Sequence, residues 1–162
     1  MVKYLRLSEY IYEIQKRYPD SCIEPISENE GDILKKIVRE KFNLIVPEQY
    51  IDFLKLTNSF EFDGELIYGM DLGYLAGDNG GEYGIIEYNE VYREDEMSQK
   101  FFFFGDGNMD AYVLDIEKGK YLIIDKFSHE TIEEFNTFNV MFEFKLDYLL
   151  ERARKYKGEI SK

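Results

Sequence analysis

The residues best suited to chemistry lie in the acidic segment FFFFGDGNMDAYVLD, residues 101–115. Asp106, Asn108, Asp110 and Glu117 fall at positions 1, 3, 5 and 12 of a loop, where a calcium-binding EF-hand places oxygen ligands. Position 6 of an EF-hand loop is glycine, whereas this chain has Ala111, and the residues that follow are typical of a strand. The pattern therefore favours a turn of Gly, Asp and Asn, and a calcium or small-ligand site stays open as an alternative.

Other arrangements that carry chemistry do not emerge from the sequence. The glycine-rich segment GDNGGEYG, residues 77–84, contains Asp78 and Glu82 and has no lysine to hold a phosphate. His129 is the only histidine, and we interpret it as a surface or strand-end residue. Cys22 is the only cysteine, and we interpret it as a buried structural thiol. We therefore predict a protein that is not an enzyme and has no metal centre and no cofactor.

The charge balance points to a class of partner. The chain has 33 Asp and Glu residues against 20 Lys and Arg residues, a formal net charge of −13. A chain this acidic repels phosphate backbones, so we expect no nucleic-acid binding. The charge serves solubility, or it attracts a basic protein partner. The single cysteine and the absence of a long apolar run predict a soluble cytoplasmic protein without a membrane segment.

The order of the apolar patterns predicts helices first, then strands, then a closing helix. Ser27 and Glu30 have the spacing of a capping box, Pro47 suits the first turn of a helix, and Asp63-Gly64 is a favoured hairpin dipeptide. We predict one α+β domain over residues 1–162, an antiparallel β-sheet flanked by α-helices. The expected segments are helices at 8–18 and from near 27 and 47, strands at 60–62, 65–69, 100–104, 110–115 and 118–125, a short helix after 85–86, an edge strand or loop at 131–135, and a final helix at 137–156.

Two blocks of the sequence resemble the SUKH superfamily. The first is LIVPEQYIDFLKLTNSFEFDGELIYG, where Pro47, Tyr50, Phe53, Leu54 and Asn58 match the usual pattern of an aliphatic run, a proline and an aromatic-bearing helix. Ser59 stands where glycine is usual, but Asn also tolerates the left-handed conformation, so we expect the helix-to-strand transition to be kept. The second is FFFFGDGNMDAYVLDIEKGKYLIIDKFSHE, whose acidic glycine turn is similar to that of the family. The resemblance covers residues 27–150.

The resemblance implies a non-catalytic α+β domain. The superfamily includes fungal Smi/Knr-type cell-wall assembly regulators and many bacterial immunity proteins, which bind and block a cognate toxin, often a nuclease, of a polymorphic or contact-dependent system. Because nuclease toxins tend to be basic, the acidity of this chain suits an immunity protein, and a regulatory or scaffold domain of the Smi/Knr type is the alternative. The oligomeric state stays open. The residues expected to bind the partner are Glu61, Asp63, Glu65, Asp78, Glu82, Asp106 and Asp110.

Overall fold

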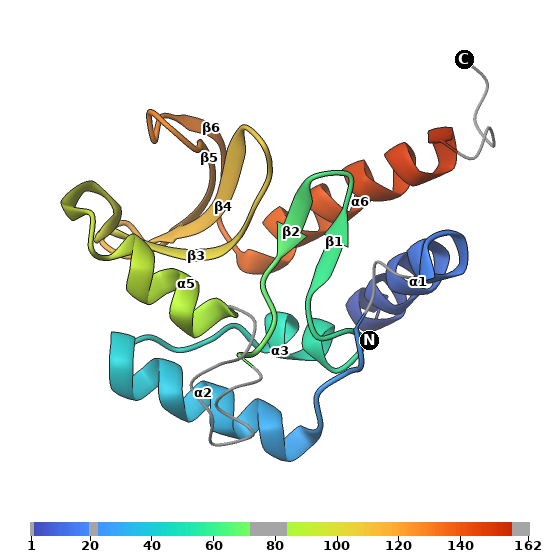
Figure 1. Cartoon of the computed structure of the whole chain (residues 1–162), viewed down its shortest axis with the longest axis horizontal. Coiled ribbons are helices and arrows are strands. Elements are labelled where there is room, and N and C mark those ends of the chain that lie inside the picture. Colours follow the sequence, from blue (N-terminus) through green and yellow to red (C-terminus); the bar gives the residue numbers. More distant parts are fainter. Residues whose placement is uncertain (1, 20–22, 72–83, 157–162) are drawn as a thin grey trace.

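An antiparallel β-sheet, in which the strands follow one another in chain order, forms the centre of the computed structural model (Figure 1). The structure describes residues 2–19, 23–71 and 84–156. Within these residues each strand pairs with the next along the chain, from β1 at one edge to β6 at the other. The strands are β1 (Phe60–Phe62), β2 (Glu65–Ile67), β3 (Phe101–Asp106), β4 (Asp110–Asp115), β5 (Lys120–Asp125) and β6 (Thr131–Phe135).

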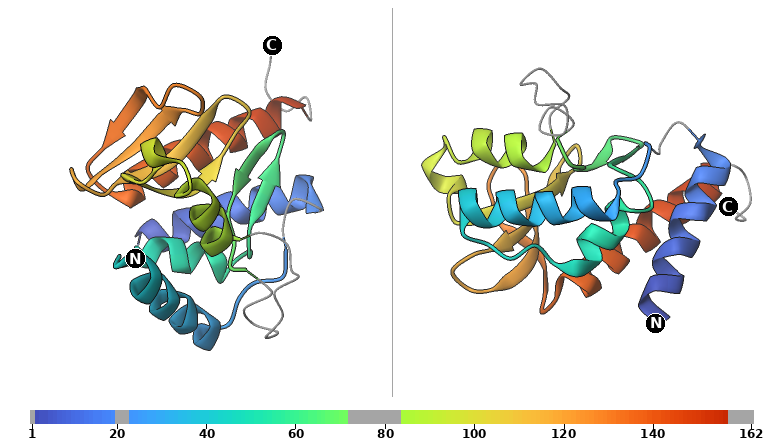
Figure 2. Two further views of the ribbon diagram at one scale, coloured as in Figure 1. Left: turned by 60° about the vertical axis from the view of Figure 1, so that its left-hand side comes forward. Right: turned by 90° about the horizontal axis from the view of Figure 1, so that it is seen from below.

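Helices flank this sheet, which confirms the predicted α+β class. α5 packs against β3, whereas α6 packs against β5 and β6. α1 lies against the C-terminal half of α6 (Figure 2). None of the helices in the described ranges is long and apolar enough to cross a bilayer. The helices are α1 (Val2–Arg17), α2 (Glu28–Phe42), α3 (Glu48–Leu54), α5 (Ile85–Tyr92), a 3₁₀ helix at Glu96–Ser98, and α6 (Phe138–Tyr156).

β3 is buried on both of its faces, as its four consecutive phenylalanines predict. Phe101–Phe104 are all almost completely inaccessible to solvent. Successive side chains of a strand point to opposite faces of the sheet. Phe102 accordingly meets Phe42 of α2 edge-on, with 5.4 Å between the ring centroids, while Phe103 stacks on Tyr92 of α5 at 4.1 Å. The apolar run therefore marks a strand that is covered by helices on both sides.

Several local signals in the sequence are confirmed. The Ser27 hydroxyl accepts a hydrogen bond from the Glu30 N–H (3.1 Å), and the Glu30 carboxylate accepts one from the Ser27 N–H (2.9 Å), so the capping box of α2 is complete. Pro47 lies at the N-cap of α3, one position before the expected first turn. The segment at 131–135 is the edge strand β6. The predicted start near Ser8 is wrong, because α1 already begins at Val2. Cys22 lies outside the described residues.

The chain passes from α3 into β1 as expected, but the left-handed residue at this point is Ser59 and not Asn58. Ser59 itself takes the left-handed conformation, with φ of 84°, where the family usually has glycine. Asn58 is buried and acts as a peptide mimic: its side-chain oxygen accepts from the Met70 N–H (2.7 Å), and its amide nitrogen donates to the Met70 carbonyl (3.3 Å). Asn58 therefore makes the hydrogen bonds with Met70, and its neighbour Ser59 takes the left-handed backbone conformation.

α5 is anchored by a buried carboxylate. Asp71 is fully buried, and its side chain accepts hydrogen bonds from the N–H groups of Gly84 (3.1 Å), Ile86 (2.9 Å) and Glu87 (2.9 Å). These are donors at the start of α5, which have no partner within the helix. A β-carbon on Gly84 would lie 2.5 Å from the Asp71 nitrogen, so only glycine fits there. Asp71 thus fixes where α5 begins, against the segment that follows β2.

We predict that Ser59→Gly stabilises the protein. An L-residue in the left-handed region has its β-carbon too close to the following carbonyl, and glycine removes that strain. The free energy of unfolding should rise by about 1 kcal/mol, which urea denaturation measures. Ser59→Ala is the matched control, because it removes the hydroxyl and keeps the β-carbon, and it should bring no gain. Equal stability of Ser59→Gly and Ser59→Ala would contradict this explanation.

Candidate functional site

Three hairpin turns meet at one end of the sheet. In an antiparallel meander, alternate turns lie at the same end, which here brings together the turns β1–β2, β3–β4 and β5–β6. A β-carbon on Gly64 would lie 2.6 Å from the Asn108 side chain, so the first two turns are in contact. The Lys126 N–H donates to the Met109 carbonyl (2.9 Å) and joins the third turn to the second. We call residues 63–64, 107–109 and 126–129 the turn end.

The first two turns are the acidic loops that the sequence selected. Asp63 and Gly64 both have positive φ, 50° and 82°, as a type I′ hairpin turn requires. In the second turn, the Gly107 N–H donates to the Asp110 carbonyl (2.8 Å) and closes the connection between β3 and β4. The hypothesis of a tight turn is therefore confirmed.

Lys145 of α6 lies between two of the predicted carboxylates. It is only 5% exposed, and its ammonium is 3.2 Å from the Glu65 carboxylate and 3.5 Å from that of Asp110. The Tyr112 hydroxyl also donates to the Glu65 carboxylate, and the Lys145 ammonium lies 4.6 Å from the centre of the Tyr112 ring. Glu65 and Asp110 thus point from β2 and β4 toward α6 and share one cation.

Arg152, two turns further along α6, holds the tip of the β1–β2 hairpin. Its guanidinium forms an ion pair with Asp63 and lies 3.8 Å from the Glu65 carboxylate. The sheet holds this hairpin over a short length, because β2 pairs with β3 through Leu66–Asp106 and Ile67–Gly105, with one more hydrogen bond from the Tyr68 N–H to the Phe104 carbonyl (2.9 Å). In Figure 1 the hairpin stands beside α6, apart from the curled strands β3–β6. The ion pairs with α6 therefore add to the buried side chains Phe60, Phe62 and Ile67 in holding the hairpin in place.

The Asp106 carboxylate lies on the opposite face of the sheet from Glu65 and Asp110. Its carboxylate accepts hydrogen bonds from the hydroxyls of Tyr68 and Tyr92 (3.2 Å for Tyr92) and from the Lys126 ammonium (3.2 Å). Lys126 also donates to the Gly107 carbonyl (3.2 Å). These donors come from the segment after β2, from α5 and from the β5–β6 turn. Asp106 thus joins three separate parts of the chain.

The protonation of these groups follows from their burial. Burial raises the pKa of the Glu65 carboxyl, and Asp110 adds to this effect, while the Lys145 ammonium opposes it. Burial, with the nearby Asp106 carboxylate, raises the pKa of Tyr68 well above its usual range, and burial raises the pKa of Tyr92 to about 12. Both tyrosines therefore remain protonated hydrogen-bond donors at neutral pH.

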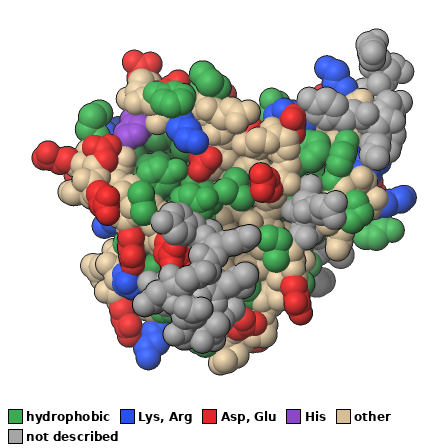
Figure 3. Space-filling view, in the orientation of Figure 1, with side chains coloured by type: hydrophobic (Ala, Val, Ile, Leu, Met, Phe, Trp, Pro, Cys, Tyr) green, Lys and Arg blue, Asp and Glu red, His purple; other side chains and the backbone are tan. Residues whose placement is uncertain are grey.

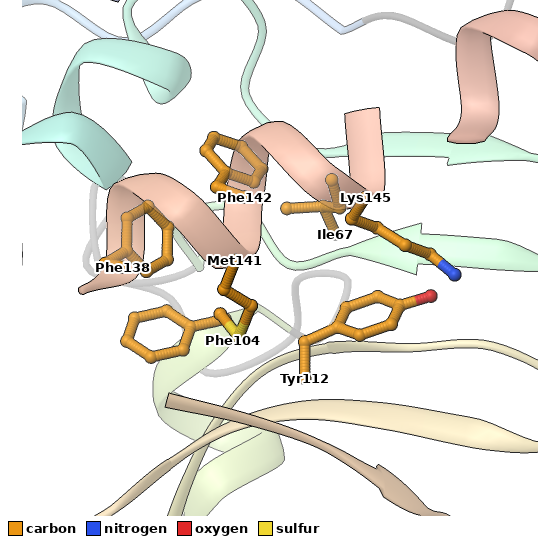
Figure 4. A pocket seen from close by; sticks show the side chains of 7 residues that line it. All are labelled: Ile67, Phe104, Tyr112, Phe138, Met141, Phe142 and Lys145. Carbon is orange, nitrogen blue, oxygen red and sulfur yellow. The ribbon is translucent and has the colours of Figure 1, made fainter. Parts of the chain in front are cut away.

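A small apolar cavity lies between α6 and the sheet, next to Lys145 (Figure 4). Its free volume of about 10 Å³ has room for about one water molecule, far less than a small-molecule site needs. Figure 4 shows the polar ends of Lys145 and Tyr112 pointing the same way, away from the rings of Phe104 and Phe138. The cavity is a packing gap. Its lining residues are Ile67, Phe104, Tyr112, Phe138, Met141, Phe142 and Lys145.

The calcium arrangement is not formed. Glu117, the expected ligand at position 12, lies in the β4–β5 turn, at the opposite end of β4 from Asp110. Asp106 and Asp110 bond to groups on opposite faces of the sheet. Across the part of the chain that the structure describes, no three His, Cys, Asp or Glu side chains are placed to hold a metal ion. The EF-hand spacing therefore does not bring these four side chains together.

The structure places the predicted partner-binding residues in different environments. Glu61 and Asp63 are exposed, whereas Asp106 and Asp110 are half-buried. Glu65 is only 8% exposed, so its carboxylate makes contacts inside the protein rather than at the surface. Asp78 and Glu82 lie outside the described residues.

The sequence analysis did not predict the lysine and arginine side chains that pair with these carboxylates. Lys145 sits among the apolar residues Phe142, Leu146 and Leu149, on the face of α6 that is buried. A charged residue within an apolar helical stripe signals a buried partner of opposite charge, and this signal was available. The pairing of Lys126 with Asp106 left no such signal, because both residues lie in or beside turns.

Comparison with known families agrees with this architecture. The sequence model of the SMI1/KNR4 family (SUKH-1) matches residues 29–143. The chain belongs to this family. The match contains both blocks on which the resemblance rested and all three turns of the turn end. A comparison with curated proteins finds no match for the chain.

We predict that Lys145→Met destabilises this SUKH-1 domain by about 3 kcal/mol, because it leaves Asp110 without its cation and Glu65 with only the more distant Arg152 guanidinium, 3.8 Å away. Burial already raises the pKa of Glu65, and losing the ammonium raises it further, so protonation relieves the unpaired charge. The loss should therefore be larger near pH 7 than near pH 4.5. Urea denaturation at both pH values measures it.

Adding Glu65→Gln to Lys145→Met should recover part of the loss, since one unpaired charge is then removed. Lys118→Met is the control: it removes an exposed lysine of the β4–β5 turn and should change stability by less than about 0.5 kcal/mol. A loss for Lys145→Met that is no larger than the control would show that the ion pairs are unimportant.

Proposed function

We propose that this SUKH-1 domain is a cytoplasmic immunity protein, a non-catalytic binding protein that neutralises a basic toxin domain by occluding it. Family membership supports a binding role, since domains of this family are generally immunity or regulatory proteins. The net charge of −13 favours a basic partner over an acidic one. The observation that carries the proposal is an acidic surface at and beside the turn end, where Glu61, Asp63 and Glu130 are exposed. The neighbouring cations Lys126, Lys145 and Arg152 are each paired with a carboxylate.

This acidic surface is held in a fixed shape. Asp63 is exposed at the tip of a type I′ turn, and its ion pair with Arg152 ties it to α6. Asp110 is anchored by Lys145, and Glu61 is exposed on β1 beside the same turn. Because ion pairs hold Asp63 and Asp110 before binding, these side chains lose less conformational entropy when a partner docks on them. Rigid presentation of charge is a property expected of an inhibitor surface.

The net charge acts at longer range. A strongly acidic protein attracts a basic one across several ångströms of solvent, and this attraction raises the association rate. Fast capture suits an immunity protein, because the toxin must be blocked before it reaches its target. Binding should accordingly weaken as salt concentration rises.

The test is co-expression of the domain with the toxin-type protein encoded next to its gene. We expect the domain to restore growth of cells that produce the toxin domain, and the two proteins to copurify at low salt. Absence of both rescue and copurification, or a neighbouring reading frame that encodes no toxin, would contradict the immunity role. The second of these results would favour a regulatory domain of the Smi/Knr type.

We also predict that Glu61→Lys slows association with the toxin domain roughly tenfold at low salt. Glu117→Lys is the matched control, because it makes the same change in net charge on an exposed glutamate at the opposite end of the sheet. Stopped-flow measurement of the association rate of each variant distinguishes an effect of the charge at position 61 from an effect of the total charge. Equal slowing by both variants would show that the turn end is not where the basic partner docks.

A further inference from the structure

Two large apolar side chains project from the turn end into solvent. Phe127 is 74% exposed in the β5–β6 turn, and Met109 is 65% exposed in the β3–β4 turn. The turns are neighbours, since the Lys126 N–H donates to the Met109 carbonyl (2.9 Å). Single exposed apolar residues are common on proteins, whereas two on adjoining turns offer a partner two apolar contacts on one surface.

We propose that the turn end is the contact surface, with Phe127 and Met109 as anchors that enter an apolar pocket rimmed by lysine or arginine on a basic protein. This inference rests on the proposed function for the partner's charge, and it adds the contact surface and the kind of pocket. Large apolar anchors at the centre of an interface, surrounded by polar groups, carry much of the binding energy of protein complexes.

The backbone of the Phe127 turn is fixed without a partner. The Asp125 carboxylate accepts hydrogen bonds from the N–H groups of Phe127 (2.9 Å) and Ser128 (2.8 Å), and these bonds lower the pKa of the Asp125 carboxyl. The His129 N–H donates to the Asp125 carbonyl (2.9 Å), and His129 takes a left-handed conformation with φ of 64°. A side chain displayed by such a turn needs little ordering on binding.

Side-chain contacts of Lys126 and His129 also hold the β5–β6 turn in place. The Lys126 ammonium bonds to Asp106 and to the Gly107 carbonyl, both at 3.2 Å, which ties the β5–β6 turn to the β3–β4 turn. The His129 ring packs edge-on against Phe101 of β3, with 5.7 Å between the ring centroids. The two anchors therefore sit on one rigid platform and keep a constant spacing.

The charged groups near the anchors are mostly acidic. Glu130 is exposed just after the Phe127 turn, and Asp110 is half-buried next to Met109. Lys126 lies between the two anchors, but its ammonium is paired with Asp106. Figure 3 shows hydrophobic, basic and acidic side chains at the surface around the histidine, which is drawn in purple. A pocket with a basic rim complements this arrangement. A second copy of the chain does not, because docking would bring two acidic rims together on proteins of net charge −13.

Binding of anchor variants to the purified toxin domain tests the proposal. We expect Phe127→Ala to raise the dissociation constant about 30-fold and Met109→Ala about fivefold in calorimetric titration. Ile45→Ala is the matched control, because Ile45 is 81% exposed between α2 and α3, and it should leave the affinity unchanged. The exposed positions predict unaltered melting temperatures for all three variants.

Unchanged affinity in Phe127→Ala, with the wild type binding, overturns the anchor proposal and leaves the immunity function standing. If the wild type does not bind the toxin domain, the immunity function fails, and photo-crosslinking in the native host then decides the anchor proposal. A benzoylphenylalanine at position 127 should crosslink to a Lys- or Arg-rich segment of another protein, and one at position 45 should not. Crosslinks only between copies of the chain, or equal crosslinks from both positions, overturn it.

Discussion

The arrangement of this domain depends on one shared cation, the Lys145 ammonium between Glu65 and Asp110. β2 meets β3 over a short length, so much of what holds the β1–β2 hairpin lies outside the hydrogen bonds of the sheet. Lys145 and Arg152 attach that hairpin to α6 and bring its turn against the β3–β4 turn. A buried ion pair often adds little net stability compared with apolar packing, but it can fix which surfaces meet. Here its role is to position the turns.

Local signals in the sequence were sufficient for the elements and not for the contacts between them. The capping box at Ser27, the Asp63-Gly64 turn and the buried strand Phe101–Phe104 follow from short-range chemistry, and each formed as predicted. The usual glycine of the family at position 59 does indicate a left-handed residue there, whereas the bonds of Asn58 with Met70, twelve residues further on, could not be derived. Long-range partners of this kind leave no local pattern.

The candidate site shows the same division. Glu61, Asp63, Asp106 and Asp110 were recognised as an acidic set, and the meander brings their turns to one end of the sheet. Strand alternation then sends Asp106 to one face and Asp110 to the other, which composition alone cannot reveal. Most of these carboxylates also brace the fold. The same residues therefore give the turn end its charge and hold its turns in place. The exposed apolar side chains Phe127 and Met109 belong to these turns.

Asp71 has a consequence for how such domains diversify. Its carboxylate binds the backbone at the start of α5, so residues 71 and 84 are held together whatever chain connects them. This anchor needs only the Asp71 carboxylate and main-chain N–H groups, so it places no demand on the side chain of Glu87. Gly84 is the exception, because a β-carbon there would lie 2.5 Å from the Asp71 nitrogen. Relatives that keep this aspartate and this glycine can therefore change the exposed side chains of α5 while the start of the helix stays in place.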